Sequence, residues 1–281
     1  MRRRTTDGFP EDDVSGSVRP KDTWASGQSY ESYVGGWSRL VAAEFLAWLA
    51  VPPGARWLDV GSGTGAVTET VLVCCSPEQV VGVEPSPAFR EYAHAHVPDP
   101  RAEFRAGDAQ SLPVDDGAFD VVVSGLVLNF VPDRAAALAE MRRAVRPGGT
   151  VAAYVWDYPG EMQLMRHFWA AAVALDPGAL SLDEAARFEF CRPDPLRALF
   201  ADAGLDDVDV RPIVVPTDFP DFDSYWAPFL GGTGTAPAYA MSLGESDRAA
   251  LRDAVRTRLA TADDGSIDLT ARAWAVRGTT P

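Results

Sequence analysis

Lysine and cysteine are scarce in this chain of 281 residues, and both shortages exclude kinds of chemistry. Lys21 is the only lysine and lies in a polar N-terminal stretch, which excludes most hydride-transfer sites built around lysine. The cysteines are Cys74, Cys75 and Cys191, too few to indicate a disulfide framework. We expect the adjacent pair to be buried in a helix, in a reducing cytoplasm.

Positive charge, histidine and long apolar runs are also in short supply. The formal net charge is −15, with 25 basic and 40 acidic residues, so the chain should repel nucleic acid. No stretch reaches the roughly 18 apolar residues of a membrane helix, and no signal peptide is apparent, so we expect no membrane partner and a cytoplasmic location. On a helix, the spacing of His94 and His96 points their rings apart, and no metal site is expected.

The most informative segment is a hydrophobic strand that runs into a glycine-rich turn. Residues 55–60 are the predicted strand, Gly61, Gly63 and Gly65 form the turn, and a helix begins near Ala66. Such a turn brings backbone N–H groups and a helix N-terminus to a bound cofactor. The spacing fits a dinucleotide site and an S-adenosyl-L-methionine (SAM) site equally, and a turn without a ligand is a third alternative.

Further motifs follow at the ends of the next predicted strands. The strand over 79–84 ends in Glu84, 23 residues after Gly61, where a carboxylate can accept hydrogen bonds from both ribose hydroxyls. The strand over 102–106 leads into Gly107, Asp108 and Ala109. A fourth strand is predicted over 119–124, and an Arg-Pro-Gly-Gly segment at 146–149 ends a helix before a fifth strand.

This ordered set of motifs resembles the class I SAM-dependent methyltransferases. It is closest to their small-molecule branch, type 11, which includes ubiquinone- and menaquinone-biosynthesis enzymes. The resemblance covers about residues 30–155 and the last two strands. It implies a Rossmann-like α/β fold, with a seven-stranded, mostly parallel sheet in the order 3-2-1-4-5-7-6, helices on both faces and lid insertions. It also implies SAM as cofactor, S-adenosyl-L-homocysteine as product and a small-molecule acceptor.

The resemblance assigns roles along the cofactor. The glycine turn would hold the methionine part, with Asp59 orienting the turn, Glu84 on the ribose and Asp108 on the adenine. An N-terminal aromatic segment would fold over the cofactor, and residues after the fourth strand would border the sulfonium. The residues assigned to cofactor binding are Tyr33, Trp37, Arg39, Asp59, Gly61, Gly63, Gly65, Glu84, Pro85, Asp108, Ala109, Ser124 and Leu126.

The acceptor side is less sharply defined, because methyl transfer mainly requires alignment and exclusion of water. The residues expected to line an acceptor pocket are Asn129, Phe130, Trp156, Tyr225 and Trp226. Asp157 and His167 are the candidate catalytic groups, and we expect substitution of Asp157 to lower the rate more.

The expected organisation is a disordered tail over 1–23 and a single methyltransferase domain over 24–281. Within that domain, 24–50 covers the cofactor, and 158–193 and 217–261 are lid insertions. Two other functions remain open from the sequence: a SAM-binding protein that does not methylate, such as a sensor or a SAM-assisted cyclase, and a nicotinamide-dependent oxidoreductase. The sequence leaves the methylated atom and the oligomeric state open.

Overall fold

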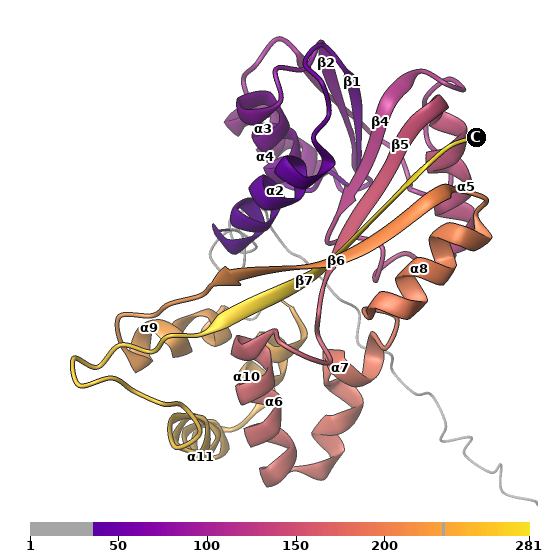
Figure 1. Ribbon diagram of the computed structural model, residues 1–281. Helices are drawn as coiled ribbons and strands as arrows, with labels where there is room; N and C mark the ends of the chain where they lie inside the picture. Colours follow the sequence, from indigo (N-terminus) through magenta and orange to yellow (C-terminus); the bar gives the residue numbers. More distant parts are fainter. Residues whose placement is uncertain (1–35, 232–233) are drawn as a thin grey trace, which may run out of the picture.

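A computed structural model describes residues 36–231 and 234–281, built around one seven-stranded sheet (Figure 1). The strand order is β3-β2-β1-β4-β5-β7-β6, which confirms the expected topology. Strands β1 to β5 pair in parallel, and β7 pairs antiparallel with both β5 and β6. The strands are β1 Arg56–Val60, β2 Gln79–Val83, β3 Ala102–Arg105, β4 Phe119–Gly125, β5 Val145–Trp156, β6 Asp206–Pro216 and β7 Thr270–Thr279.

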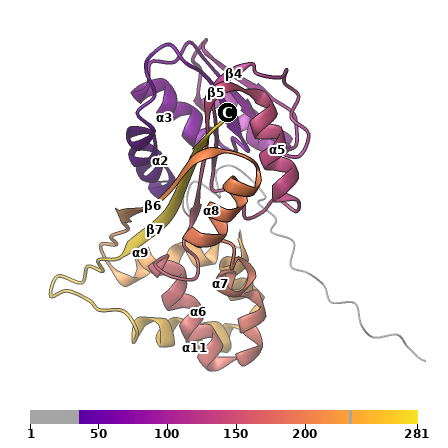
Figure 2. The same cartoon turned by 45° about the vertical axis from the view of Figure 1, so that its right-hand side comes forward.

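Helices cover both faces of the sheet. Helices α2 and α3 pack together on one face, and α5 and α8 lie on the other (Figures 1 and 2). Local capping sets two helix starts: Ser86 accepts a hydrogen bond from the Phe89 amide, and Asp133 from the Ala136 amide. These helices are α2 Gly36–Leu49, α3 Ala66–Cys74, α4 Pro87–His96, α5 Arg134–Ala144 and α8 Pro193–Asp202.

The register of the parallel strands brings their carboxyl ends to one edge. Val60 of β1 pairs with Val83 of β2, and Val83 pairs with Arg105 of β3. The inner strands are apolar and buried on both faces, as parallel strands between helix layers must be. The loops after β1, β2, β3 and β4 therefore meet at one place, where ligands of doubly wound sheets bind.

The two expected insertions pack against each other as one helical subdomain, next to the ends of β5 and β7 (Figure 1). Its core is aromatic: the Phe168 and Phe229 rings stack with centroids 4.4 Å apart. The first insertion contains α6 Gln163–Leu175, the 3-10 helix η2 Pro177–Leu182 and α7 Glu184–Arg187. The second contains α9 Phe222–Trp226, the 3-10 helix η3 Ala227–Leu230, α10 Thr235–Ser242 and α11 Glu245–Arg256.

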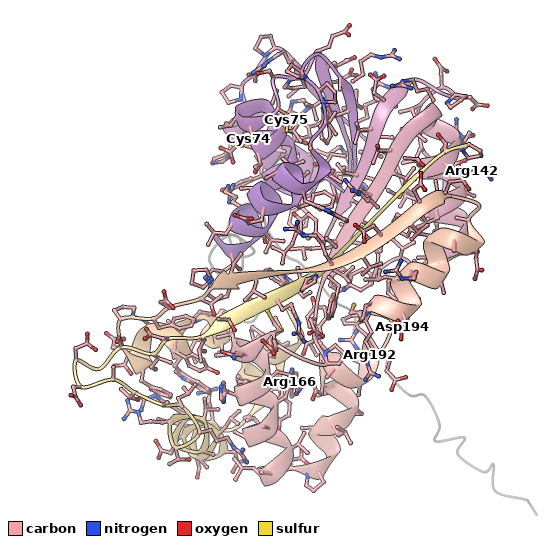
Figure 3. The ribbon with its side chains drawn as sticks, viewed as in Figure 1. Cys74, Cys75, Arg142, Arg166, Arg192 and Asp194 are labelled. Carbon is pink, nitrogen blue, oxygen red and sulfur yellow. The ribbon has the colours of Figure 1, made fainter. Side chains whose placement is uncertain are left out.

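The cysteine pair is placed differently from the expectation. Cys74 is exposed and Cys75 half-buried at the end of α3, because the C-terminus of this helix faces solvent; Cys191 is buried. Figure 3 shows the pair beside α3, far from Arg166 of the helical subdomain.

Among the described residues, no helix has the length and apolar character needed to span a bilayer. The same residues contain no group of three or more histidine, cysteine or carboxylate side chains arranged to hold a metal. The expected tail over 1–23 lies outside the described residues.

Candidate cofactor and acceptor site

A cavity of about 960 Å³ opens where the carboxyl ends of β1 to β4 meet. This volume is near the upper end of the range for small-molecule sites, about 300–1,000 Å³, and leaves room for a cofactor together with an acceptor. Its walls come from the glycine turn, the loops after β2, β3 and β4, and α7 of the first insertion. The residues that line it are Ser38, Gly61, Ser62, Gly63, Thr64, Ala66, Val67, Glu84, Pro85, Ser86, Phe89, Asp108, Ala109, Gly125, Leu126, Val127, Asn129, Phe130, Val131, Pro132, Tyr154, Arg187 and Phe188.

The glycine turn is held against β2 by its backbone. The Gly61 and Ser62 amides both donate to the Val83 carbonyl, at 2.8 and 3.1 Å. Gly61 has φ +74°, and a Cβ there would lie 2.6 Å from the Val127 side chain. Gly63 has φ +53°, but an added Cβ would meet no protein atom closer than 3.9 Å. Gly63 therefore borders open space in the cavity, as a turn that cradles a ligand requires.

Glu84 connects the end of β2 to this turn. One carboxylate oxygen accepts from the Gly63 amide at 3.1 Å and the other from the Ser86 amide at 2.8 Å. Burial raises the pKa of Glu84, and these two backbone hydrogen bonds oppose the rise. The carboxylate lines the cavity with further lone pairs, so it fits the expected position beside a ribose.

Asp59 lies behind the turn and is not among the residues that line the cavity. Its side chain is 1% exposed; Oδ2 accepts from the Thr68 hydroxyl at 2.8 Å, and Oδ1 has no partner among the described residues. Burial raises the pKa of Asp59 from 3.8 to about 7. Asp59 therefore connects the end of β1 to the first turn of α3 through Thr68, and its expected role toward the cofactor remains a prediction.

We expect the pH dependence of stability to report this burial. Between pH 4 and 7 the folded chain binds the Asp59 proton more tightly than the unfolded chain, so this group lowers the free energy of unfolding as pH rises. Asp59→Asn should remove that contribution, so the melting temperature of the wild type should fall relative to the variant between pH 5 and pH 8. Circular dichroism melts without ligand measure it, with the exposed Asp115→Asn as control. If the melting temperatures of wild type and Asp59→Asn changed equally with pH, the raised pKa of Asp59 would be contradicted.

The loops after β3 and β4 complete the expected cofactor side. Asp108 is exposed at the cavity, and Ala109 lines it beside Asp108. Leu126 lines the cavity with φ +62°, a left-handed conformation that costs free energy in a non-glycine residue. Ser124 does not reach the cavity. Its hydroxyl is fully buried between strands and donates to the Val60 carbonyl at 2.9 Å, so it ties β4 to β1 instead.

The N-terminal segment meets the site through another residue than expected. Ser38 lines the cavity, whereas Trp37 packs edge-on against Phe219 and Arg39 forms an ion pair with Glu69 at 3.0 Å. Trp37, Ser38 and Arg39 follow one another in the first turn of α2. Successive side chains of a helix point in different directions, so only Ser38 of these three faces the cavity. Tyr33 lies outside the described residues.

Asp157 is a structural carboxylate rather than a group of the cavity. It is 3% exposed and forms an ion pair with Arg272 of β7 at 2.6 Å. It also accepts from the Gly160 and Glu161 amides, which shapes the turn that leaves β5. The sequence places Asp157 at the end of a strand, but its partner Arg272 is a distant residue that only the fold brings near.

We therefore expect Asp157→Ala to act on stability. Removing Asp157 leaves the Gly160 and Glu161 amides without their acceptor and leaves half-buried Arg272 with its longer ion pair to Glu161 at 3.4 Å, at a cost of about 1–3 kcal/mol. The free energy of unfolding in urea measures it. Arg272→Ala should show a similar loss, and the double variant should lose less than the sum of the two. Additive losses of the free energy of unfolding would show that the interaction between Asp157 and Arg272 does not stabilise the fold.

Of the other acceptor-side expectations, Asn129 and Phe130 line the cavity, whereas the remaining four residues lie elsewhere. Tyr225 is fully buried and donates to the Leu164 carbonyl at 2.8 Å, and Trp226 packs at 5.6 Å from Phe229 in the helical subdomain. Trp156 is 2% exposed and does not line the cavity. His167 is half-buried on α6 outside the cavity, and burial and Arg258 lower its pKa. Tyr225 and Trp226 fill the subdomain core because each can bury a large apolar area there.

The structure adds Arg187, Phe188, Tyr154 and Ser38 to the cavity wall. An ion pair and a hydrogen bond hold α7 in place. Both terminal nitrogens of Arg166 donate to the Asp183 carboxylate, at 2.9 and 2.6 Å, and buried Glu184 accepts from the Trp169 indole. Burial raises the pKa of Glu184 to about 7. No sequence motif marks Arg187 or Phe188, because their position depends on how the first insertion folds back.

The fold and this cavity define a class of protein: a doubly wound α/β domain that binds a nucleoside cofactor across the ends of its parallel strands. A glycine turn open toward the cavity, the Glu84 carboxylate in the cavity wall, and the Ser62 hydroxyl, which has no partner among the described residues, offer hydrogen-bonding groups that fit those of SAM.

Comparison with known proteins supports the same class of protein. A family model described as "Methyltransferase domain" matches residues 58–153. The demethylmenaquinone methyltransferase of Roseiflexus castenholzii is 36% identical over 175 residues, which cover 58% of this chain and 73% of that protein. The 2-methyl-6-phytyl-1,4-hydroquinone methyltransferase of Synechocystis is 34% identical over 124 residues, covering 44% of this chain and 39% of that one.

Among solved structures, the phosphoethanolamine N-methyltransferase 2 of Haemonchus contortus in complex with SAM shares the fold. Its TM-score is 0.58 at 16% identity, covering 97% of this chain and 61% of that chain. The chain belongs to the family of SAM-dependent methyltransferases.

Proposed function

We propose that this chain transfers the methyl group of SAM to an oxygen, nitrogen or carbon atom of a small molecule with a flat, largely apolar body. The observation that supports this best is the far wall of the cavity. Beyond the glycine turn and Glu84, the wall consists mainly of apolar and aromatic side chains, among them Leu126, Phe130 and Phe188. The cavity volume also leaves space for a second molecule.

When bound, SAM supplies a methyl group activated by positively charged sulfur. The protein then has to hold an acceptor atom in line with that methyl and keep water out. In our proposal Glu84, Gly63 and Asp108 hold the cofactor, and the aromatic wall holds the acceptor. Of the two candidate catalytic groups, Asp157 is engaged with Arg272 and His167 lies outside the cavity, so neither is proposed as a base.

The relatives guide the choice of acceptor. One is named for demethylmenaquinone and another for a hydroquinone, both of which are ring systems that carry oxygen atoms. The aromatic wall of this cavity suits a ring of that kind, since flat rings pack well edge-on or offset against Phe side chains. We propose a hydroxylated aromatic ring as the acceptor class to test first.

The test is a transfer assay with SAM and a panel of hydroquinones, phenols, aliphatic amines and thiols. Mass spectrometry detects the added methyl group, and nuclear magnetic resonance of the product identifies the methylated atom. We expect product with at least one ring hydroxyl compound. Tight SAM binding without transfer to any class would favour the alternative of a SAM-binding protein that does not methylate.

A further inference from the structure

Asn129 is the only asparagine in the chain, and it lies in the cavity wall. Its side chain is 3% exposed, and neither Nδ2 nor Oδ1 has a hydrogen-bond partner among the described residues. A buried amide without partners is costly, at about 1–3 kcal/mol for each unsatisfied group. Such a group at the wall of a binding cavity indicates that it serves a ligand.

The loop that carries Asn129 is held from outside the cavity. Arg134 of α5 donates to the carbonyl of Leu128 at 2.9 Å and to that of Asn129 at 3.3 Å. The Arg134 guanidinium lies over the Phe190 ring, 4.5 Å from its centroid. The Phe130 amide donates to the Val127 carbonyl at 2.8 Å, which closes a turn around Asn129. The Asn129 amide is therefore presented by a fixed backbone.

The sheet order places Asn129 on the acceptor side of the cofactor. The residues expected to face adenine, ribose and methionine follow β3, β2 and β1, which are neighbours in that order across the sheet, and β4 is next. Asn129 follows β4, so it lies beyond the end of the cofactor where the methyl group is expected. The aromatic rings beside it belong to Phe130 and Phe188, which meet edge-to-face with centroids 5.3 Å apart.

Arg187 brings a positive charge to the same wall. Its Nη1 donates to the Thr235 hydroxyl of the second insertion at 2.7 Å, and its guanidinium lies 4.9 Å from the Phe188 ring centroid. Both insertions therefore support this corner of the cavity. A cation beside an acceptor oxygen favours the negative charge that develops when a ring hydroxyl loses its proton.

We propose that Asn129 determines acceptor specificity by hydrogen-bonding a ring hydroxyl of the acceptor, with the ring against Phe130 and Phe188. The inference rests on the proposed function. An amide offers one oxygen that accepts and one NH2 group that donates, and a hydroxyl can satisfy both. A site built to bind a hydroxyl in this way discriminates strongly against an analogue that lacks it. Because an amide does not titrate near neutral pH, its role is positioning and selection.

The experiment compares wild type with Asn129→Leu, which keeps a similar volume without polar atoms, and with Asn129→Asp, which keeps an acceptor but loses the donor. The probes are the hydroquinone methylated best in the transfer assay and its analogue lacking one hydroxyl. For the hydroquinone, kcat/KM should fall about 10- to 100-fold in Asn129→Leu. For the analogue, kcat/KM should hardly change, so the variant should lose the preference for the hydroquinone over the analogue. SAM affinity should be unchanged.

The matched control is Thr217→Val. The Thr217 hydroxyl is also buried and without a partner among the described residues, but it is not part of the cavity wall. Thr217→Val should leave the preference for the hydroquinone over its analogue unchanged. Equal losses on both probes in Asn129→Leu, or no loss, would overturn the inference. Weakened SAM binding in that variant would also overturn it, by assigning Asn129 to the cofactor.

A binding readout separates this inference from the proposed function. Calorimetry with the protein saturated in S-adenosyl-L-homocysteine compares 1-naphthol with 1-methylnaphthalene. If no acceptor is methylated, the proposed function fails, yet a preference for 1-naphthol that Asn129→Leu removes would still support the subsite. If wild type shows no such preference in either assay, the subsite proposal fails.

Discussion

Gly63→Val is expected to abolish SAM binding while leaving the chain folded. Gly63 has φ +53°, and an added side chain would project into the cavity, where no protein atom lies within 3.9 Å of its Cβ. A branched side chain would therefore take the space of the cofactor and strain the turn by about 1–3 kcal/mol. Calorimetry should detect no SAM binding up to about 1 mM, the limit where binding free energy falls to about −4 kcal/mol.

Gly54→Val is the matched control for this variant. Gly54 has φ +83°, and no atom lies within 4 Å of an added Cβ, but it is not part of the cavity wall. It should show a comparable loss of stability from backbone strain and normal SAM affinity. Normal SAM binding by Gly63→Val would mean that the turn does not cradle the cofactor.

Glu84→Ala is expected to weaken SAM binding about 10- to 100-fold, which is less than Gly63→Val. Hydrogen bonds to a charged group contribute about 1.5–3 kcal/mol, and each 1.4 kcal/mol is tenfold in affinity. The variant also loses the two amide contacts that connect Glu84 to Gly63 and Ser86, so part of the loss reflects a looser turn. Isothermal titration of SAM measures the change.

Two comparisons interpret the Glu84 result. Glu84→Gln preserves the shape of the side chain, so its SAM affinity separates the loss of charge from the loss of contact with the turn. Glu78→Ala removes an exposed carboxylate that precedes the same strand and should have no effect. An unchanged affinity in folded Glu84→Ala would show that this carboxylate does not face the ribose.

The cofactor half of the site is readable from the sequence because its residues sit at strand ends. Gly61, Glu84 and Asp108 each lie at or just after the end of a predicted strand, and parallel strands in register bring such positions to one edge. Their roles in binding SAM remain predictions, but their meeting at one cavity follows from the topology alone.

The acceptor half is less readable because strand-end position does not determine what a side chain meets. Trp156 ends β5 and Asp157 follows it, yet Arg272 from β7 pairs with the Asp157 carboxylate and the Trp156 side chain is buried. Tyr225 and Trp226 were expected at the acceptor because they are aromatic. The same property makes them core residues of the helical subdomain once the two insertions pack together.

By itself, the sequence predicted an alternating α/β chain from its apolar runs, glycines and order of motifs, and its resemblance to class I methyltransferases implied the strand order that the structure confirms. Only the tertiary structure decided which polar groups are left for a ligand. Asp157 is satisfied by Arg272, a partner 115 residues away, whereas the buried Asn129 amide has no partner among the described residues. Hydrogen bonds between distant segments form only when the chain has folded, so no local pattern could separate these two residues.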